Sequence, residues 1–71
     1  MTAIEIELGE RLRKLRSDRR LSLRDLATHS GLTASFISQV ERGRASPSIT
    51  SLARLAETFG VSVGQFFGPA P

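Results

Sequence analysis

The 71-residue sequence contains no cysteine and only one histidine, His29. Without thiols there is no disulfide framework and no thiolate metal site, and one imidazole cannot hold a zinc ion alone. The sequence also has no glycine-rich phosphate loop, and no serine and acid are placed around His29 as a catalytic triad would require. We therefore expect no metal site, no catalytic residues, no cofactor and no enzymatic activity, with His29 on the surface.

Long apolar runs are missing as well. No segment approaches the ~20 apolar residues that a membrane span needs, and the acidic beginning, MTAIEIELGE, does not resemble a signal peptide. These absences predict a soluble, cytoplasmic protein without membrane contact. A single domain of this size has a marginal core, because a domain near 60 residues buries only about 60% of its unfolded surface. We expect that core to be built from helices, whose contacts are local.

The charge that is present is unevenly distributed. Ten basic residues against seven acidic ones give a net charge of +3 and a pI near 11.1. Nine of the ten basic residues are arginine, and seven of the ten lie between Arg11 and Arg24. The guanidinium fork suits bidentate contacts with phosphate. Such a basic domain has the electrostatic footprint of a nucleic-acid binder, although a solvated helix surface would give a similar run of charge.

Apolar periodicity predicts a first helix that ends near Asp18. Its apolar positions follow the spacing i, i+4, i+8, i+11, as expected for one helix stripe: Ile4, Leu8, Leu12 and Leu15. A strand is the alternative, because Ile4, Ile6 and Leu8 alternate. The alternation stops after Leu8 while the helical spacing continues, which favours the helix.

Two short helices joined by the turn SGLT are predicted next, over about residues 23–42. Ser22 can cap the first of them, with Asp25 as its capping-box partner, and Gly31 can end it in the left-handed conformation. The side of this helix expected to face inward carries Leu23, Leu26 and Ala27. Two helices with this connection form a helix-turn-helix.

The second helix of this pair begins at the cap Thr33 and ends at Gly43. Its inward side is expected to carry Thr33, Ile37 and Val40, with Phe36 on the flank. The opposite arc has the spacing i, i+3, i+4, i+7 and contains Ser35, Ser38, Gln39 and Arg42.

A fourth helix follows Pro47, with Ser48 as its cap and Gly60 at its end. Its apolar set is Ile49, Leu52, Leu55, Ala56 and Phe59. The segment VSVGQFFG could be a short strand, but Ser62 and Gln65 form a capping-box pattern that favours a fifth helical turn. That turn would carry Val63, Phe66 and Phe67. Residues 68–71, GPAP, are typical of a tail or linker.

In order and spacing, these segments resemble the Cro/repressor-type (Xre family) DNA-binding domain. The resemblance covers roughly residues 8 to 67 and is carried by LSLRDLA, then SGLT, then SFISQVERG, then SPSITSLARLAETFGVS. It implies that residues 1–67 form an all-α, five-helix, lambda-repressor-like bundle whose third helix enters the DNA major groove. It further implies a transcriptional regulator, by default a repressor, that binds a palindromic operator on double-stranded DNA as a homodimer with half-sites about 34 Å apart.

The resemblance assigns base reading to four positions of the third helix: Ala34, Ser35, Ser38 and Gln39. Gln can pair bidentately with adenine and Ser can pair with several bases, whereas Ala offers only a methyl group to thymine. Arginines and free N–H groups at helix N-termini suit phosphate, which suggests Ser22, Arg24, Thr33, Arg42 and Arg44. The alternative for the outward arc is an ordinary solvated helix face.

One charged pair has a structural interpretation. Glu41 lies on the core margin of the third helix and Arg16 on that of the first, and the family pairs these positions. We expect a partly buried Arg16–Glu41 ion pair. Two departures from the family pattern are Leu23, where a glutamine is common, and Arg20, where a turn glycine is common and a positive φ would strain an arginine.

The C-terminal turn is the candidate dimer surface, through Val63, Phe66 and Phe67, with ordinary core packing as the alternative. The ending is also similar to the DNA-binding halves of regulators that continue into a cupin barrel, which would imply a missing C-terminal effector-binding domain. Short stand-alone regulators, such as restriction–modification controllers or phage repressors, end similarly. A small helical protein-docking module that does not bind DNA is the alternative function.

Overall fold

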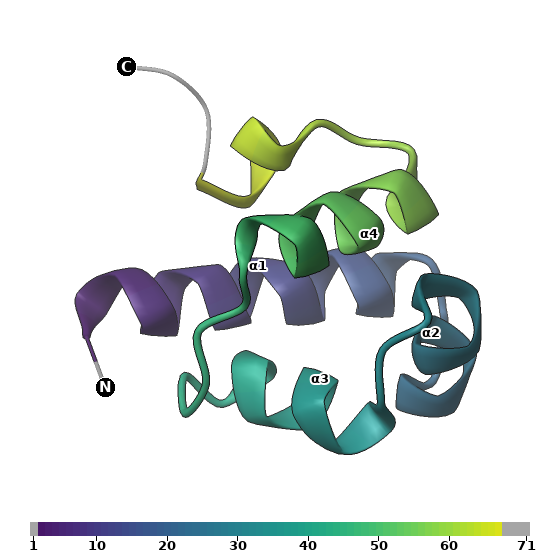
Figure 1. Ribbon diagram of the computed structural model, residues 1–71, viewed down its shortest axis with the longest axis horizontal. Helices are drawn as coiled ribbons and strands as arrows, with labels where there is room; N and C mark the ends of the chain where they lie inside the picture. Colours follow the sequence, from purple (N-terminus) through teal and green to yellow (C-terminus); the bar gives the residue numbers. More distant parts are fainter. Residues whose placement is uncertain (1, 68–71) are drawn as a thin grey trace.

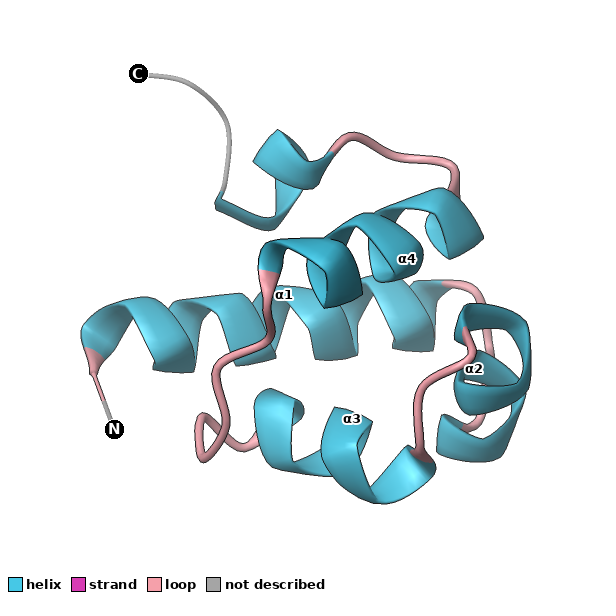
Figure 2. Cartoon of the chain, in the orientation of Figure 1, coloured by secondary structure: helices cyan, strands magenta, loops and turns pink. Residues whose placement is uncertain are grey.

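The computed structural model describes residues 2–67, and at Phe67 only the backbone. Four α-helices and a short 3-10 helix, η1, surround one core (Figure 1): α1 Ala3–Asp18, α2 Leu23–Ser30, α3 Ala34–Glu41, α4 Ile49–Phe59 and η1 Val63–Phe67. All described elements are helical, as Figure 2 shows, so the predicted all-α class is confirmed. No helix in residues 2–67 is both long and apolar enough to cross a membrane. The predicted tail, residues 68–71, lies outside the described residues.

The count of five α-helices is not confirmed, because the described part of the chain has four and the fifth element is a 3-10 helix. Half of the predicted capping box is present there: the Ser62 N–H donates to the Gln65 side chain at 2.9 Å. The Gln65 N–H in turn bonds the Ser62 carbonyl, three residues back, at 3.1 Å. Bonding over three residues is the 3-10 pattern, which is typical of segments this short.

The internal helices begin at the caps that the sequence predicts. The Ser22 hydroxyl accepts from the Asp25 N–H at 3.0 Å, and the Ser22 N–H donates to the Asp25 carboxylate at 3.1 Å. Thr33 caps α3, and Ser48 caps α4 through the N–H three residues on, each at 3.1 Å. These local bonds set where each helix starts, independently of the core.

Left-handed residues end the helices. Gly31, Gly43 and Gly60 have φ values of 75°, 72° and 70°. At the end of α1 the same place is taken by Arg20, with φ 55°. There the Leu21 N–H reaches back to the Arg16 carbonyl at 3.1 Å, which completes a Schellman motif. The arginine therefore adopts the strained conformation that the sequence suggested.

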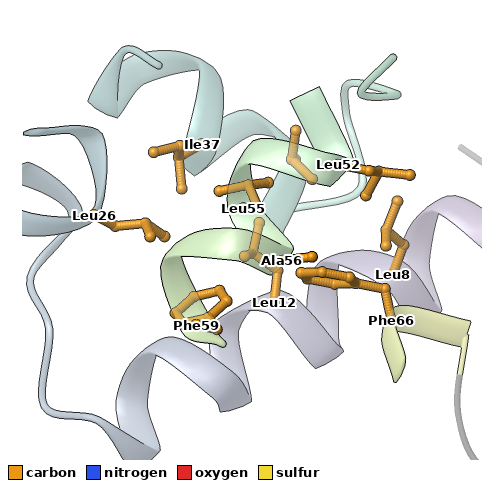
Figure 3. Close-up of a cluster of buried hydrophobic side chains, with 10 residues drawn as sticks. Leu8, Leu12, Leu26, Ile37, Leu52, Leu55, Ala56, Phe59 and Phe66 are labelled. Carbon is orange, nitrogen blue, oxygen red and sulfur yellow. The ribbon is translucent and has the colours of Figure 1, made fainter. Parts of the chain in front are cut away.

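Every element contributes to the core. Ten side chains are buried, nine of them labelled in Figure 3: Leu8, Leu12, Leu26, Ile37, Val40, Leu52, Leu55, Ala56, Phe59 and Phe66. Others that the sequence placed inward pack against this cluster while half-buried, including Leu15, Leu23, Ala27 and Phe36. The inward side of α3 is thus fixed to the other helices by Ile37 and Val40.

Four predicted positions need correction. Ile4 and Ile49 are 66% and 75% exposed, because each lies in the first turn of its helix, beyond the elements that cover the rest of the stripe. Thr33 is exposed because it caps α3 from outside the helix. Phe66 is 1% exposed and lies in the core, so in this structure its side chain is not part of a dimer surface.

Of the other two candidate dimer residues, Val63 is half-buried and packs against the core cluster. The side chain of Phe67 lies outside the described residues.

The helix α1 crosses the end of α3 at a glycine that the sequence analysis did not single out. A Cβ atom at Gly9 would lie 2.4 Å from the Val40 carbonyl oxygen and 2.7 Å from that of Glu41. Real Cβ atoms essentially never approach backbone so closely, so only glycine allows this crossing. Gly9 therefore sets the depth at which α3 sits on α1.

Candidate nucleic-acid interface

The helix α3 runs along the lower edge of the molecule in Figure 1, and its outward arc is accessible. Ser35, Gln39 and Arg42 are exposed, while Ala34 and Ser38 are half-buried. Among hydrogen bonds between described residues, none uses the side-chain hydroxyls of Ser35 and Ser38 or the Gln39 amide. Ahead of Arg42, the arc is therefore an uncharged row of free donors and acceptors.

The short side chains on this arc allow another molecule to come close to the helix. Serine hydroxyls and a glutamine amide both donate and accept, which is what reading base edges in a major groove requires. Arg42 follows at the C-cap, where its Nε donates to the Ser38 carbonyl at 3.4 Å. Within residues 2–67, no hydrogen bond engages its terminal nitrogens at the end of the arc.

The N-terminus of α3 is suited to an anion. Thr33 satisfies the N–H of Phe36, while the first two N–H groups of the helix have no acceptor within the helix, and its first turn has no acidic residue. Free N–H groups and the positive end of the helix dipole favour a phosphate there.

The N-terminus of α2 is different, because Asp25 already occupies it. The Ser22 N–H that donates to Asp25 lowers the pKa of that carboxyl, so it stays ionised at neutral pH. A negative charge at this end opposes a phosphate. Ser22 is exposed, as a phosphate contact requires, but it shares its helix end with the Asp25 carboxylate. Arg24, in the first turn of α2, is exposed and basic.

The predicted ion pair holds α3 in place. Arg16 Nε lies 2.7 Å from Glu41 Oε2, and Arg16 Nη2 lies 3.0 Å from Oε1. The two side chains are only 16% and 6% exposed, and Glu41 raises the pKa of the guanidinium. A contact that the sequence did not indicate is a third bond, from Arg16 Nη1 to the Leu21 carbonyl at 2.9 Å. One arginine thus joins α1, the end of α3 and the turn before α2.

Ser30 is another residue that the sequence analysis missed. It is 6% exposed, and its hydroxyl accepts from the Leu32 N–H at 3.3 Å and lies 3.5 Å from the Ala27 carbonyl. These bonds fix the turn between α2 and α3. The only local signal was a small polar residue directly before Gly31.

The remaining basic candidate, Arg44, is exposed in the loop between α3 and α4. Its N–H donates to the Gln39 carbonyl at 2.8 Å, and the Gly43 N–H donates to that of Val40 at 3.0 Å. The two bonds form a Schellman motif that keeps the loop against the end of α3.

The single histidine, His29, is exposed at the end of α2, as the sequence suggested.

A family model described as "Helix-turn-helix domain" matches residues 7–65. The chain belongs to this helix-turn-helix family. Its fold closely resembles the restriction-modification controller protein C.AhdI from Aeromonas hydrophila, with a TM-score of 0.90 and 35% identity over 93% of this chain and 100% of that one.

Two curated relatives of this helix-turn-helix domain are longer proteins. The HTH-type transcriptional regulator DdrOP3 of Deinococcus deserti is 43% identical over 58 residues, which are 82% of this chain and 45% of the relative. The HTH-type transcriptional regulator PuuR of Escherichia coli is 42% identical over 59 residues, which are 83% of this chain and 32% of the relative. The chain therefore spans less than half the length of these relatives.

Proposed function

We propose that this helix-turn-helix domain binds a specific sequence of double-stranded DNA and regulates transcription, with α3 in the major groove. The observation that carries the proposal is the free, uncharged polar arc of α3, followed at its end by Arg42 and Arg44. The similarity to regulators of transcription supports the same function. A regulator that acts on DNA in this way would work in the cytoplasm.

Base reading is assigned to the arc. Gln39 is the residue long enough for a bidentate pair with adenine, while Ser35 and Ser38 accept several bases. Ala34, half-buried at the start of the helix, contributes at most a methyl contact to thymine. Gln39 therefore carries most of the discrimination, about 1–3 kcal/mol for one bidentate pair.

Phosphate contacts surround the arc. We assign one to the N-terminus of α3 at Thr33 and others to Arg42 and Arg44, which lie at its opposite end. Arg24 is a further contact from α2. Ser22 is the weakest member of the set, because the carboxylate of Asp25 shares its helix end.

A homodimer is part of the proposal. One recognition helix contacts only a few base pairs, too few to single out one operator among a genome's competing sites. Two copies related by a two-fold axis would read half-sites about 34 Å apart. The exposed edge of η1 around Val63 is the proposed contact between the copies, and repression by occupying a promoter is the expected outcome.

Selection from a random DNA pool tests the function. A DNA-binding regulator should enrich a palindromic sequence, and its affinity should fall with salt with a log–log slope of about −0.9 per neutralised phosphate. Gln39→Ala should relax the preference at one position of each half-site, while Arg44→Ala should weaken binding to all sequences alike. If the folded protein enriches no sequence and shows no salt-dependent affinity, the alternative of a protein-docking module is favoured.

A further inference from the structure

The loop between α3 and α4 is held at three points. Its beginning is fixed by the bond from the Arg44 N–H to the Gln39 carbonyl, at 2.8 Å. Ala45 packs against the hydrophobic core. The hydroxyl of Ser46 donates to the carboxylate of Glu5, which lies 41 positions earlier in the chain. Between these anchors the side chain of Arg44 remains exposed.

Glu5 is itself oriented by the beginning of α1. Its Oε1 accepts from the Thr2 N–H at 2.9 Å, and its own N–H donates to the Thr2 hydroxyl at 3.1 Å, which together form a capping box. The other oxygen, Oε2, accepts from Ser46. The helix start therefore presents one carboxylate oxygen to the loop, and the bond from Ser46 lowers the pKa of Glu5, so that it is ionised at neutral pH.

A carboxylate beside a basic loop that contacts DNA has two opposite effects. Its charge repels the DNA backbone, which weakens binding. Its hydrogen bond orders the loop in advance, so that less conformational freedom is lost when Arg44 engages a phosphate. The two effects have opposite signs, so an experiment can separate them.

We propose that Glu5 and Ser46 are positioning residues for DNA binding: their hydrogen bond fixes the loop so that Arg44 is presented to a DNA phosphate. This inference rests on the proposed function. It assigns a role in binding to the first turn of α1, which lies away from the helix-turn-helix itself.

The test measures affinity for the selected DNA by fluorescence anisotropy at fixed salt. Ser46→Ala breaks the bond and should weaken binding about threefold or more, equally for matched and mismatched sequences. Glu5→Ala also breaks the bond and should weaken binding, but by less, because it removes the repelling charge as well. Glu5→Gln keeps an acceptor oxygen and removes the charge, so its affinity should equal or exceed that of the wild type. Arg44→Ala should cost less in the Ser46→Ala background than in the wild type.

Ser17→Ala is the matched control, because it removes an exposed serine hydroxyl from the same helix and leaves both the Ser46–Glu5 bond and the Thr2–Glu5 capping box intact. It should bind DNA like the wild type, and thermal melts establish that every variant is folded at the assay temperature. Additive losses for Ser46→Ala and Arg44→Ala would overturn the inference, as would tighter binding by Glu5→Ala. If Ser46→Ala weakens binding and Glu5→Ala does not, the inference is also overturned, because that result points to a direct contact of Ser46 with DNA. If the wild type binds no DNA, the proposed function itself fails.

Discussion

Removing either partner of the Arg16–Glu41 ion pair should strongly lower the free energy of unfolding. Glu41→Ala leaves the Arg16 cation, on a side chain that is only 16% exposed, without its carboxylate, and Arg16→Ala leaves the Glu41 carboxylate, on a side chain that is 6% exposed, without its cation. Breaking a buried pair from one side costs about 3–5 kcal/mol. A 71-residue domain has a total stability of roughly 4–10 kcal/mol, at about 0.05–0.15 kcal/mol per residue. One substitution therefore removes about 30% or more of it.

Thermal melts followed by circular dichroism measure this loss. Each kcal/mol lowers the Tm of a domain this small by about 4–8 °C, so each single variant should melt more than about 10 °C below the wild type. Arg16→Ala should be the worse of the two, because it also removes the bond to the Leu21 carbonyl. Arg16→Lys should recover only part of the loss, since a lysine cannot make the two-pronged contact or reach the carbonyl at the same time.

Two double variants test whether the loss of stability comes from breaking the ion pair. Arg16→Met with Glu41→Leu replaces two buried charges by apolar groups of similar size, which is often neutral or stabilising. It should therefore melt well above either single alanine variant. If the Arg16→Ala and Glu41→Ala losses simply add in the double alanine variant, the coupling energy is zero and the pair does not hold α1 to α3.

Three further changes test other parts of the structure. Arg20→Gly should raise the Tm by several degrees in the same melts, because a non-glycine residue at φ 55° costs on the order of 1 kcal/mol; no rise would show that the turn is unstrained. Gly9→Ala should destabilise the fold and weaken DNA binding together, because its Cβ would meet the Val40 carbonyl at 2.4 Å; unchanged melting and binding would contradict the crossing. Hydrogen bonds hold the pKa values of Asp25 and Glu5 below their ordinary 3.8 and 4.5. The stability that the two ionised carboxylates contribute is therefore present above their ordinary pKa values and is lost as the pH falls through the lowered pKa values of the folded state. A variant that carries both Asp25→Asn and Glu5→Gln should show a smaller fall in Tm on acidification than the wild type.

Local features of the fold could be predicted from the sequence because their causes are local. The caps Ser22, Thr33 and Ser48 act on N–H groups three residues away, and Gly31 and Gly60 end their helices through their own backbone. A few residues of sequence contain all that these features need.

Features that depend on distant segments could not be predicted in the same way. The need for glycine at position 9 comes from the backbone of α3, and the bond between Glu5 and Ser46 joins residues 41 positions apart. Periodicity correctly identified the inward side of α1 and α4 but not how far the covering elements extend, which is why Ile4 and Ile49 are exposed. The Arg16–Glu41 pair could be predicted only from the family resemblance, because helix spacing alone places each residue at the margin of the core and does not pair them.

The accessible arc of α3 depends on residues that lie outside it. An isolated helix shorter than about 12–15 residues is marginal in water, and α3 has eight. Its position is therefore fixed by burial of Ile37 and Val40, the close crossing at Gly9 and the ion pair from Arg16. Under the proposed function, a change in any of these contacts would move Gln39 relative to a base edge without altering the chemistry of the arc. Base preference should consequently respond to substitutions on the inner side of α1, whereas substitutions on its solvent side, such as Lys14→Gln, should leave it unchanged.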